Sequence, residues 1–122
     1  MNRAELGRTG EAIAAKYYIR QGYLLLNHNY HTRFGELDLI LYKENTVVFA
    51  EVKTRTSTAR MAPAEAVDAA KCQRLAAAAA QYLQRSPYAD AVIRFDVVEV
   101  TSGTDGWRVH CIPNAFDSDF IL

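Results

Sequence analysis

Two short segments of the sequence carry acidic residues and a lysine that together could bind a divalent cation and act on a phosphate ester. Glu36 and Asp38 lie in the first segment, and Glu51 and Lys53 lie in the second. Residues 43–45, between the segments, have the composition of a turn between two strands. An antiparallel pairing closed by this turn places Asp38 opposite Glu51, and Glu36 opposite Lys53.

This pairing would bring two carboxylates face to face. Paired Cβ atoms in an antiparallel ladder lie about 4.5–5.5 Å apart, and like charges facing each other destabilise the pair. Mg²⁺ would relieve the repulsion, because it prefers oxygen ligands and is satisfied by one or two carboxylates and several waters. Lys53 shares a strand face with Glu51. It is therefore placed to orient or deprotonate an attacking water, or to stabilise developing charge.

The same four residues would also fit an exposed strand face on which acids and lysine form salt bridges. On spacing alone this second interpretation is favoured, because so short a pattern occurs often by chance. The choice between the two therefore depends on the rest of the chain.

The elements that must position these residues follow the order α-β-β-β-α-β-β. Helical spacing of apolar residues predicts the helices, and alternation predicts the strands. Gly7 and Gly10, within the first helix, suggest that another part of the chain approaches it closely. The predicted helices are residues 2–21 and 63–85, with a break near 67–68; the strands are 23–29, 36–42, 46–53, 91–100 and 107–113; a mobile loop covers 54–62 and a turn 102–106.

The two central strands also predict a buried face. Their alternate residues are apolar and should point away from the acids, into the core. Most aromatic residues, Trp107 and Phe95 among them, are expected in the same core. Phe34, next to Gly35, is the weaker case and could be exposed. The residues predicted to share the buried face are Leu37, Leu39, Leu41, Val48, Ala50 and Val52.

Length and composition restrict the class of protein. The chain has 122 residues, half of them apolar, and no net charge, which fits one domain without long disorder. No apolar run approaches the roughly 20 residues of a membrane span, and the charged N-terminal residues argue against a secretory signal. Cys72 and Cys111 match no zinc or haem spacing. Two reduced thiols make a cytoplasmic location the expectation.

Charge is distributed unevenly along the chain. Residues 1–35 carry +3, residues 36–52 carry −3, residues 53–85 carry +4 and residues 86–122 carry −4. An acidic centre between two basic segments would suit a metal site whose neighbours contact phosphates. Alternating charge for solubility explains the same pattern, and on charge alone it is favoured.

Several short motifs are spread over nearly the whole chain: Gly7-Arg8-Thr9-Gly10-Glu11, residues 35–40, residues 48–55, Glu65-Ala66-Val67-Asp68, Lys71, residues 94–98 and Asn114-Ala115-Phe116. In this order they resemble the bacterial YraN family. That family looks like the restriction-endonuclease-like, or PD-(D/E)xK, nuclease fold and is similar in arrangement to archaeal Holliday junction resolvases. The resemblance implies one such domain over residues 1–122, of α/β class, with a three-layer core around a mixed central sheet.

The nuclease pattern transfers to individual residues. Asp38 matches its first acid, Glu51 its second and Lys53 its lysine, while Glu11 matches the additional acid of resolvase-like members. One feature departs from the pattern. Leu37 stands where the motif has proline, which is common in this superfamily.

The resemblance implies a metal-dependent endonuclease whose partner is DNA, including branched DNA. One or two Mg²⁺ or Mn²⁺ ions per site would be held by Asp38, Glu51 and the Val52 carbonyl, without an organic cofactor or a membrane. Similarity to resolvases also implies a homodimer. Five basic residues are candidates for phosphate contact, with ordinary surface charge as the alternative: Arg8, Arg33, Arg55, Lys71 and Arg74.

Two further functions remain open from the sequence. The chain could be a nucleic-acid-binding module that keeps the nuclease fold without efficient catalysis, as its neutral net charge suggests. It could also be an interaction domain whose carboxylates meet a basic protein. The intact acid–acid–lysine set favours the nuclease.

Overall fold

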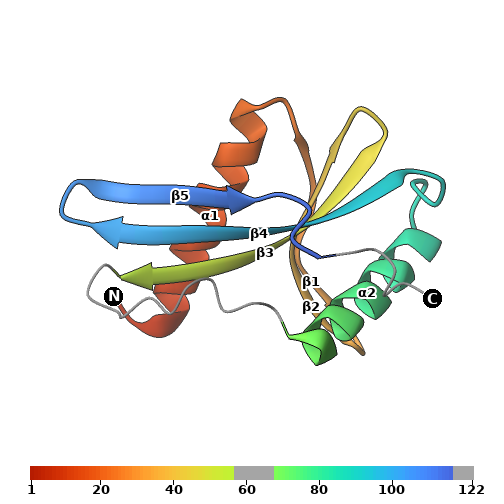
Figure 1. Cartoon of the computed structure of the whole chain (residues 1–122), viewed down its shortest axis with the longest axis horizontal. Helices are drawn as coiled ribbons and strands as arrows, with labels where there is room; N and C mark the ends of the chain where they lie inside the picture. The colour runs from red at the N-terminus through yellow and green to blue at the C-terminus, as the bar shows by residue number, and fades with distance from the viewer. Residues whose placement is uncertain (57–67, 117–122) are drawn as a thin grey trace.

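The computed structural model describes residues 1–56 and 68–116 of the chain. In these residues the elements follow the predicted order α-β-β-β-α-β-β (Figure 1). They are α1 (Arg3–Arg20), β1 (Leu24–Thr32), β2 (Gly35–Lys43), β3 (Thr46–Thr56), α2 (Ala69–Gln84), β4 (Val92–Gly103) and β5 (Gly106–Ile112).

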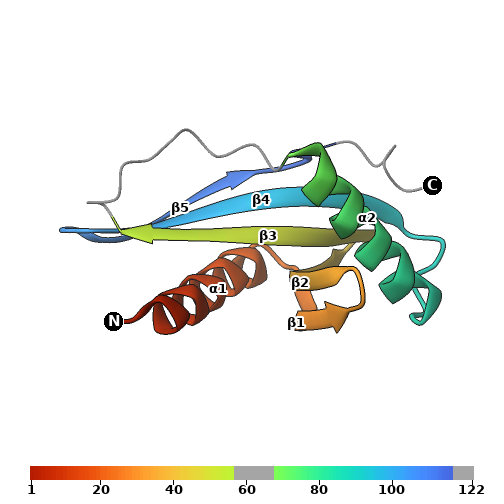
Figure 2. The same ribbon diagram turned by 90° about the horizontal axis from the view of Figure 1, so that it is seen from below.

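The five strands form one sheet in the order β1-β2-β3-β4-β5. Neighbouring strands are antiparallel except for β3 and β4, which are parallel and are connected through α2. Figure 2 shows the sheet nearly edge-on, with α1 on one side and α2 on the other. The protein is therefore of α/β class with a mixed central sheet, as predicted.

The β2–β3 hairpin has the predicted register over its first five pairs. Glu44 and Asn45 adopt φ of 49° and 62°, the left-handed conformation that a tight two-residue hairpin turn requires at both positions. The ladder runs from the pair Lys43↔Thr46 to the pair Leu39↔Ala50. It ends one residue before Asp38, so the two strands separate where the acidic residues begin.

Helix α1 lies close to β3 at Gly10. The helix begins at Asn2, whose side chain accepts a hydrogen bond from the backbone N–H of Glu5 (2.9 Å) and so caps its first turn. A Cβ on Gly10 would overlap the Thr54 side chain, whereas one on Gly7 would meet open space. The predicted close approach is therefore confirmed at Gly10 only.

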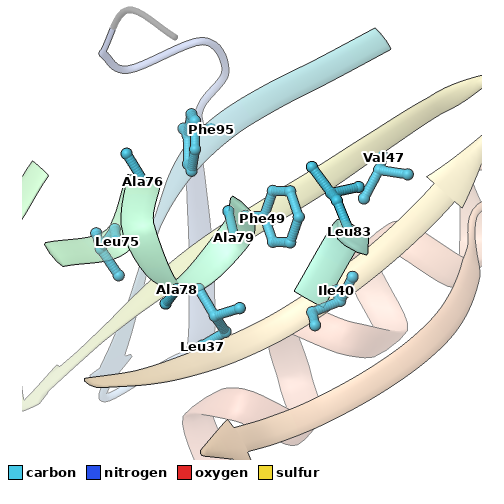
Figure 3. Packing of buried hydrophobic residues seen from close by; sticks show 10 residues of the cluster. All are labelled: Leu37, Ile40, Val47, Phe49, Leu75, Ala76, Ala78, Ala79, Leu83 and Phe95. Atoms are coloured by element: carbon cyan, nitrogen blue, oxygen red, sulfur yellow. The ribbon is translucent and has the colours of Figure 1, made fainter. Parts of the chain in front are cut away.

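Each face of the sheet has its own hydrophobic core. On one face, α2 packs its leucines and alanines on residues of β2, β3 and β4 (Figure 3). On the other face, Tyr18 and two alanines of α1 pack on Leu39, Leu41 and Val48. The prediction that Leu37 shares a face with Leu39 is wrong. Leu37 is buried with α2, because the regular alternation of β2 is interrupted where this strand leaves β3.

Several predicted boundaries also differ. Residues 54–56 continue β3 instead of beginning a loop, because they pair with residues 101–102 and Val100 of β4. The turn predicted at 102–106 is shorter, since β4 extends to Gly103 and β5 starts at Gly106. Helix α2 begins after Asp68, whose side chain caps it. The rest of the predicted loop, residues 57–62, and the start of the predicted helix, residues 63–67, lie outside the described residues. Trp107, expected in the core, is 36% exposed at the edge strand β5.

Cys72 and Cys111 are not joined by a disulfide bond. Neither described helix is both long and apolar enough to cross a membrane.

Candidate metal centre

Three carboxylates from two distant parts of the chain converge at the point where β2 separates from β3. Glu11 comes from α1, and Glu36 and Asp38 come from the first half of β2. Each offers an oxygen, and these three oxygens all lie within 4.8 Å of one another. The close contact of Gly10 with β3 brings the α1 residue into this group, because it lets the helix lie directly on the sheet.

Asn29 holds two of these carboxylates together. Its side-chain Nδ2 donates to Oε1 of Glu11 (3.0 Å) and to Oε1 of Glu36 (2.7 Å). Its φ of 48° is a conformation that asparagine tolerates better than most residues. Asn29 is not among the predicted site residues, and an asparagine within a predicted strand is the only signal of it in the sequence.

Asp38 is the most perturbed acid of the group. Its Oδ2 accepts a hydrogen bond from the backbone N–H of Val52 (2.9 Å), which lowers the pKa of the carboxyl. Burial and then the charge of Glu51 act in the opposite direction, and the charges of Glu11 and Glu36 add to them. The net effect raises the pKa of Asp38 from 3.8 to about 7. The carboxylate therefore lies where negative charge is in excess.

Glu51 is 8% exposed on β3 and forms an ion pair with Lys71 of α2 (2.9 Å). The Asp68 side chain accepts a hydrogen bond from the backbone N–H of Lys71 (2.8 Å). Asp68 thus caps the first turn of α2, and Lys71 in that turn reaches Glu51 on the sheet. Glu51 and Asp38 line one hollow, and Glu51 is the charged residue that raises the pKa of Asp38 the most. The predicted proximity of these two acids is confirmed, although no ladder pair joins them.

Lys53 follows Glu51 by two residues on β3 and therefore points to the same face of the sheet. Its neighbour on β4 is Glu99. The prediction that Glu36 lies opposite Lys53 is wrong, because the β2–β3 ladder ends earlier and Glu36 instead pairs with His31 of β1.

The carbonyl of Val52, a predicted metal ligand, lies on the β2 side of β3. The N–H of Val52 points to Asp38, and in a strand the N–H and C=O of one residue point to the same neighbour. This position is compatible with the predicted ligand role, which the structure leaves untested.

Two of the predicted phosphate contacts lie beside the acids. Lys71 and Arg74 of α2 line a hollow of about 320 Å³ together with Glu36, Asp38 and Glu51. Cations and carboxylates thus share one open surface on the α2 side of the sheet.

The other predicted basic residues are more dispersed. Arg8 lines a hollow of about 310 Å³ with Glu11 on the α1 side, and Arg55 lines another of about 320 Å³, also with Glu11. Arg33 lies in a separate hollow beyond Phe34. Glu11 therefore lines two hollows on the α1 side of the sheet. The other three acids, Glu36, Asp38 and Glu51, line the hollow on the α2 side.

The donor set of this centre consists of carboxylate oxygens. Hard cations such as Mg²⁺ and Mn²⁺ bind oxygen ligands of this kind. A doubly charged ion would also reduce the repulsion that raises the pKa of Asp38. The residues present therefore fit such an ion, with Glu11, Glu36 and Asp38 as the nearest set and Glu51 close to them.

Comparison with known proteins gives one family. A family model described as "Uncharacterised protein family UPF0102" matches residues 10–100, a range that contains all the acids of the centre as well as Lys53 and Lys71. A UPF0102 protein of Syntrophomonas wolfei is 46% identical over 95% of this chain and 100% of its own length. Relatives with the same description from Anaeromyxobacter dehalogenans (43%; 96% and 87%) and Symbiobacterium thermophilum (45%; 91% and 95%) are similar.

Proposed function

We propose that this chain, which belongs to the UPF0102 (YraN) family, is a cytoplasmic, divalent-metal-dependent endonuclease that hydrolyses phosphodiester bonds of DNA. Residues 1–122 would form one restriction-endonuclease-like domain. The observation that carries the proposal is the convergence of four carboxylates at one edge of the sheet, with Asp38 at a pKa of about 7. Acids shifted in this way are typical of functional sites.

The acids would hold Mg²⁺ or Mn²⁺, as one or two ions. Asp38 and Glu51 would be ligands from the two central strands, with the Val52 carbonyl beside them, and Glu11 would complete the set from α1. When bound, the ion would polarise the phosphate and make a water molecule more acidic. Asn29 would keep Glu11 and Glu36 in place through its two hydrogen bonds.

Lys53 would act on the reacting groups. Its amine lies on the same face as Glu51, one strand pleat further along β3, where it can orient the attacking water or stabilise the negative charge that develops on the phosphate. Lys71 has a second role in this scheme: its ion pair with Glu51 (2.9 Å) offsets part of the acidic charge. Because Lys71 is itself about one-third exposed, it can also contact a neighbouring phosphate.

DNA would approach across the open surface on the α2 side. Lys71 and Arg74 border the acids there, and Arg8 and Arg55 lie on the α1 side of the same sheet edge. Basic residues around an acidic centre allow the polyanion to bind while the acids remain available to a cation. Branched DNA and a homodimer follow from the resemblance to resolvases, and light scattering with and without DNA tests the dimer.

A cleavage assay tests the proposal. Labelled four-way junction, flap, single-stranded and linear duplex DNA are incubated with Mg²⁺ or Mn²⁺ and the parent protein. We expect Asp38→Asn, Glu51→Gln and Lys53→Ala to reduce cleavage by about 100-fold or more. Asp90→Asn, which neutralises an exposed acid after α2, is the matched control and should cleave like the parent. A fully active Asp38→Asn protein would contradict the assignment.

Two other outcomes would favour the alternatives. Salt-sensitive DNA binding without cleavage by any protein preparation would indicate a binding module that keeps the fold. Absence of both cleavage and binding would indicate an interaction domain whose carboxylates meet a basic partner.

A further inference from the structure

The hollow that Arg33 lines has a volume of about 540 Å³ and lies between the β1–β2 turn and the last turns of α2. Arg33 and Phe34 line it from the turn, and Gln81, Gln84 and Arg85 line it from the helix and its C-terminal end. We propose that this hollow, called here the arginine hollow, binds an unpaired stretch of the nucleic-acid strand whose backbone passes the acidic centre. The inference rests on the proposed function, because it assumes that the substrate is a polynucleotide.

The arginine hollow adjoins the hollow that Glu36, Asp38 and Glu51 line. Phe34 lines both, so its ring separates the surface of the acids from the surface of the arginines. On α2, the polar residues that border the two hollows recur at helical spacing: Lys71 and Arg74 beside the acids, then Gln81 and Arg85 beside the turn. One stripe of the helix therefore connects the two hollows.

The arginine hollow is positively charged, whereas the neighbouring hollow, with three acidic and two basic residues, has a net negative charge. Two arginines line it, and none of its lining residues is acidic, although the whole chain has as many acidic as basic residues. In the amide orientation that satisfies both side chains, the oxygen of Gln81 accepts from Nη1 and Nη2 of Arg85 (3.2 and 3.1 Å). Guanidinium groups match the geometry of phosphate oxygens, so this surface suits an anion.

Phe34 supplies the feature that distinguishes a nucleic acid from a simple anion. Its side chain is partly exposed, and the guanidinium of Arg33 lies 4.7 Å from the centre of its ring. A ring next to cationic groups is the combination that single-strand-binding proteins use, because bases stack on the ring while cations hold the backbone. The two small residues Ala77 and Ala80 form the helix side of the hollow and leave room for such a base.

The dimensions favour an unpaired strand over a duplex. A hollow of about 540 Å³ is of the size that encloses a small organic molecule, hence a nucleotide or two. Along the helix stripe, the distance from Lys71 to Arg85 is about 21 Å at 1.5 Å per residue. The rise of about 3.4 Å per phosphate of one strand within duplex DNA is a lower limit for an unpaired strand, which can extend further, so this length spans at most about six nucleotides. A strand that is cut at the acids would therefore leave a few unpaired nucleotides along α2.

Binding without cleavage tests the inference. Fluorescence anisotropy in EDTA compares a labelled single-stranded DNA, a duplex with a single-stranded overhang and a blunt duplex. We expect Phe34→Ala and Arg85→Ala each to weaken binding of the first two by about tenfold and to change binding of the blunt duplex by less than twofold. Phe34→Trp should retain parent affinity because it keeps a stacking surface. Arg20→Ala, an exposed arginine at the far end of α1, is the control. A matching RNA strand shows whether the sugar contributes.

Salt dependence provides a second measurement. Loss of a phosphate contact at Arg85 should reduce the slope of log Kd against log salt by about 0.7 for a single strand, whereas Phe34→Ala should leave the slope unchanged. Phe34 also packs against the α2 core, so each variant is first compared with the parent by thermal unfolding. Arg85 is exposed, and its variant keeps the test valid should Phe34→Ala fail to fold.

Two results would overturn the inference: equal losses for single-stranded and blunt DNA, or parent affinity in both Phe34→Ala and Arg85→Ala. These results are separable from failure of the nuclease assignment. The binding assay needs neither metal nor turnover, so selective loss of single-strand binding supports the arginine hollow even where Asp38→Asn retains full cleavage.

Discussion

Neutralising Asp38 is expected to stabilise the metal-free protein above pH 7. In the unfolded chain this carboxyl loses its proton near its ordinary pKa of 3.8, whereas in the folded protein it keeps the proton until about pH 7. Between these values the folded state binds more protons than the unfolded state. The free energy of unfolding therefore falls as the pH rises from about 4 to about 7, and it stays lower above that range.

The raised pKa sets the size of this effect. A shift of about three pKa units, at 1.36 kcal/mol per unit, corresponds to at most about 4 kcal/mol. Small domains have roughly 5–15 kcal/mol of total stability, so the loss would be large. Asn carries no charge at any of these pH values, and its side-chain oxygen can still accept the hydrogen bond from Val52. The Asp38→Asn protein should thus exceed the parent by about 1–4 kcal/mol at pH 8 and by little at pH 4.

Urea unfolding in EDTA at pH 4, 6 and 8 measures the difference, with Asp90→Asn as the control for loss of an exposed acid. Addition of Mn²⁺ at about 100 times its Kd should stabilise the parent at pH 8 by about 2.7 kcal/mol and stabilise Asp38→Asn much less. A metal-free Asp38→Asn protein no more stable than the parent at pH 8 would refute the reasoning, because burial and the neighbouring charges would then impose no cost on the Asp38 carboxylate.

Other changes should alter stability in directions that the packing dictates, each measured by urea unfolding. Gly10→Ala should destabilise by about 1–3 kcal/mol, since the added methyl would overlap a β3 side chain, whereas Gly7→Ala, with open space around it, should be neutral or stabilise by up to about 1 kcal/mol. Tyr18→Phe should cost about 1.5–3 kcal/mol, because the Tyr18 hydroxyl donates to the fully buried Asp96 (2.8 Å). Glu99→Met should stabilise by about 1–3 kcal/mol, because one buried carboxylate oxygen of Glu99 has no hydrogen-bond partner within residues 1–56 and 68–116; a less stable variant would mean that this oxygen is satisfied.

The register of the β2–β3 hairpin could be predicted because it depends on local features. The turn residues Glu44 and Asn45 accept positive φ, and the alternation of the two strands leaves one pairing that buries the apolar side chains. This pairing was enough to bring Asp38 close to Glu51. The order of the elements was predictable for the same reason, since helical and alternating patterns are both local.

The composition of the acidic centre was harder to predict because it depends on where the hairpin ends. Once β2 leaves β3, Leu37 turns to the α2 side, and Glu36 is paired only with β1. Strand alternation contains no information about that separation. The ion pair between Glu51 and Lys71 and the hydrogen bond from Asn29 to Glu11 also join different elements of the fold. Their positions follow from how α1 and α2 pack on the sheet, which spacing within one segment does not determine.

The negative charge of the acidic centre lowers the stability of the metal-free protein and also allows the centre to bind a cation. Lys71 forms an ion pair with Glu51, and Asn29 provides two hydrogen bonds without charge. Burial and the negative charges of Glu51, Glu11 and Glu36 nevertheless raise the pKa of Asp38. Protons and divalent ions should compete for this excess charge. Below pH 7 the proton wins, and the affinity for Mn²⁺ should fall as Asp38 becomes protonated. Calorimetric titration of Mn²⁺ at pH 6 and pH 8 should show at least a several-fold weaker Kd at pH 6. Equal affinity at both values would mean that Asp38 is not among the ligands.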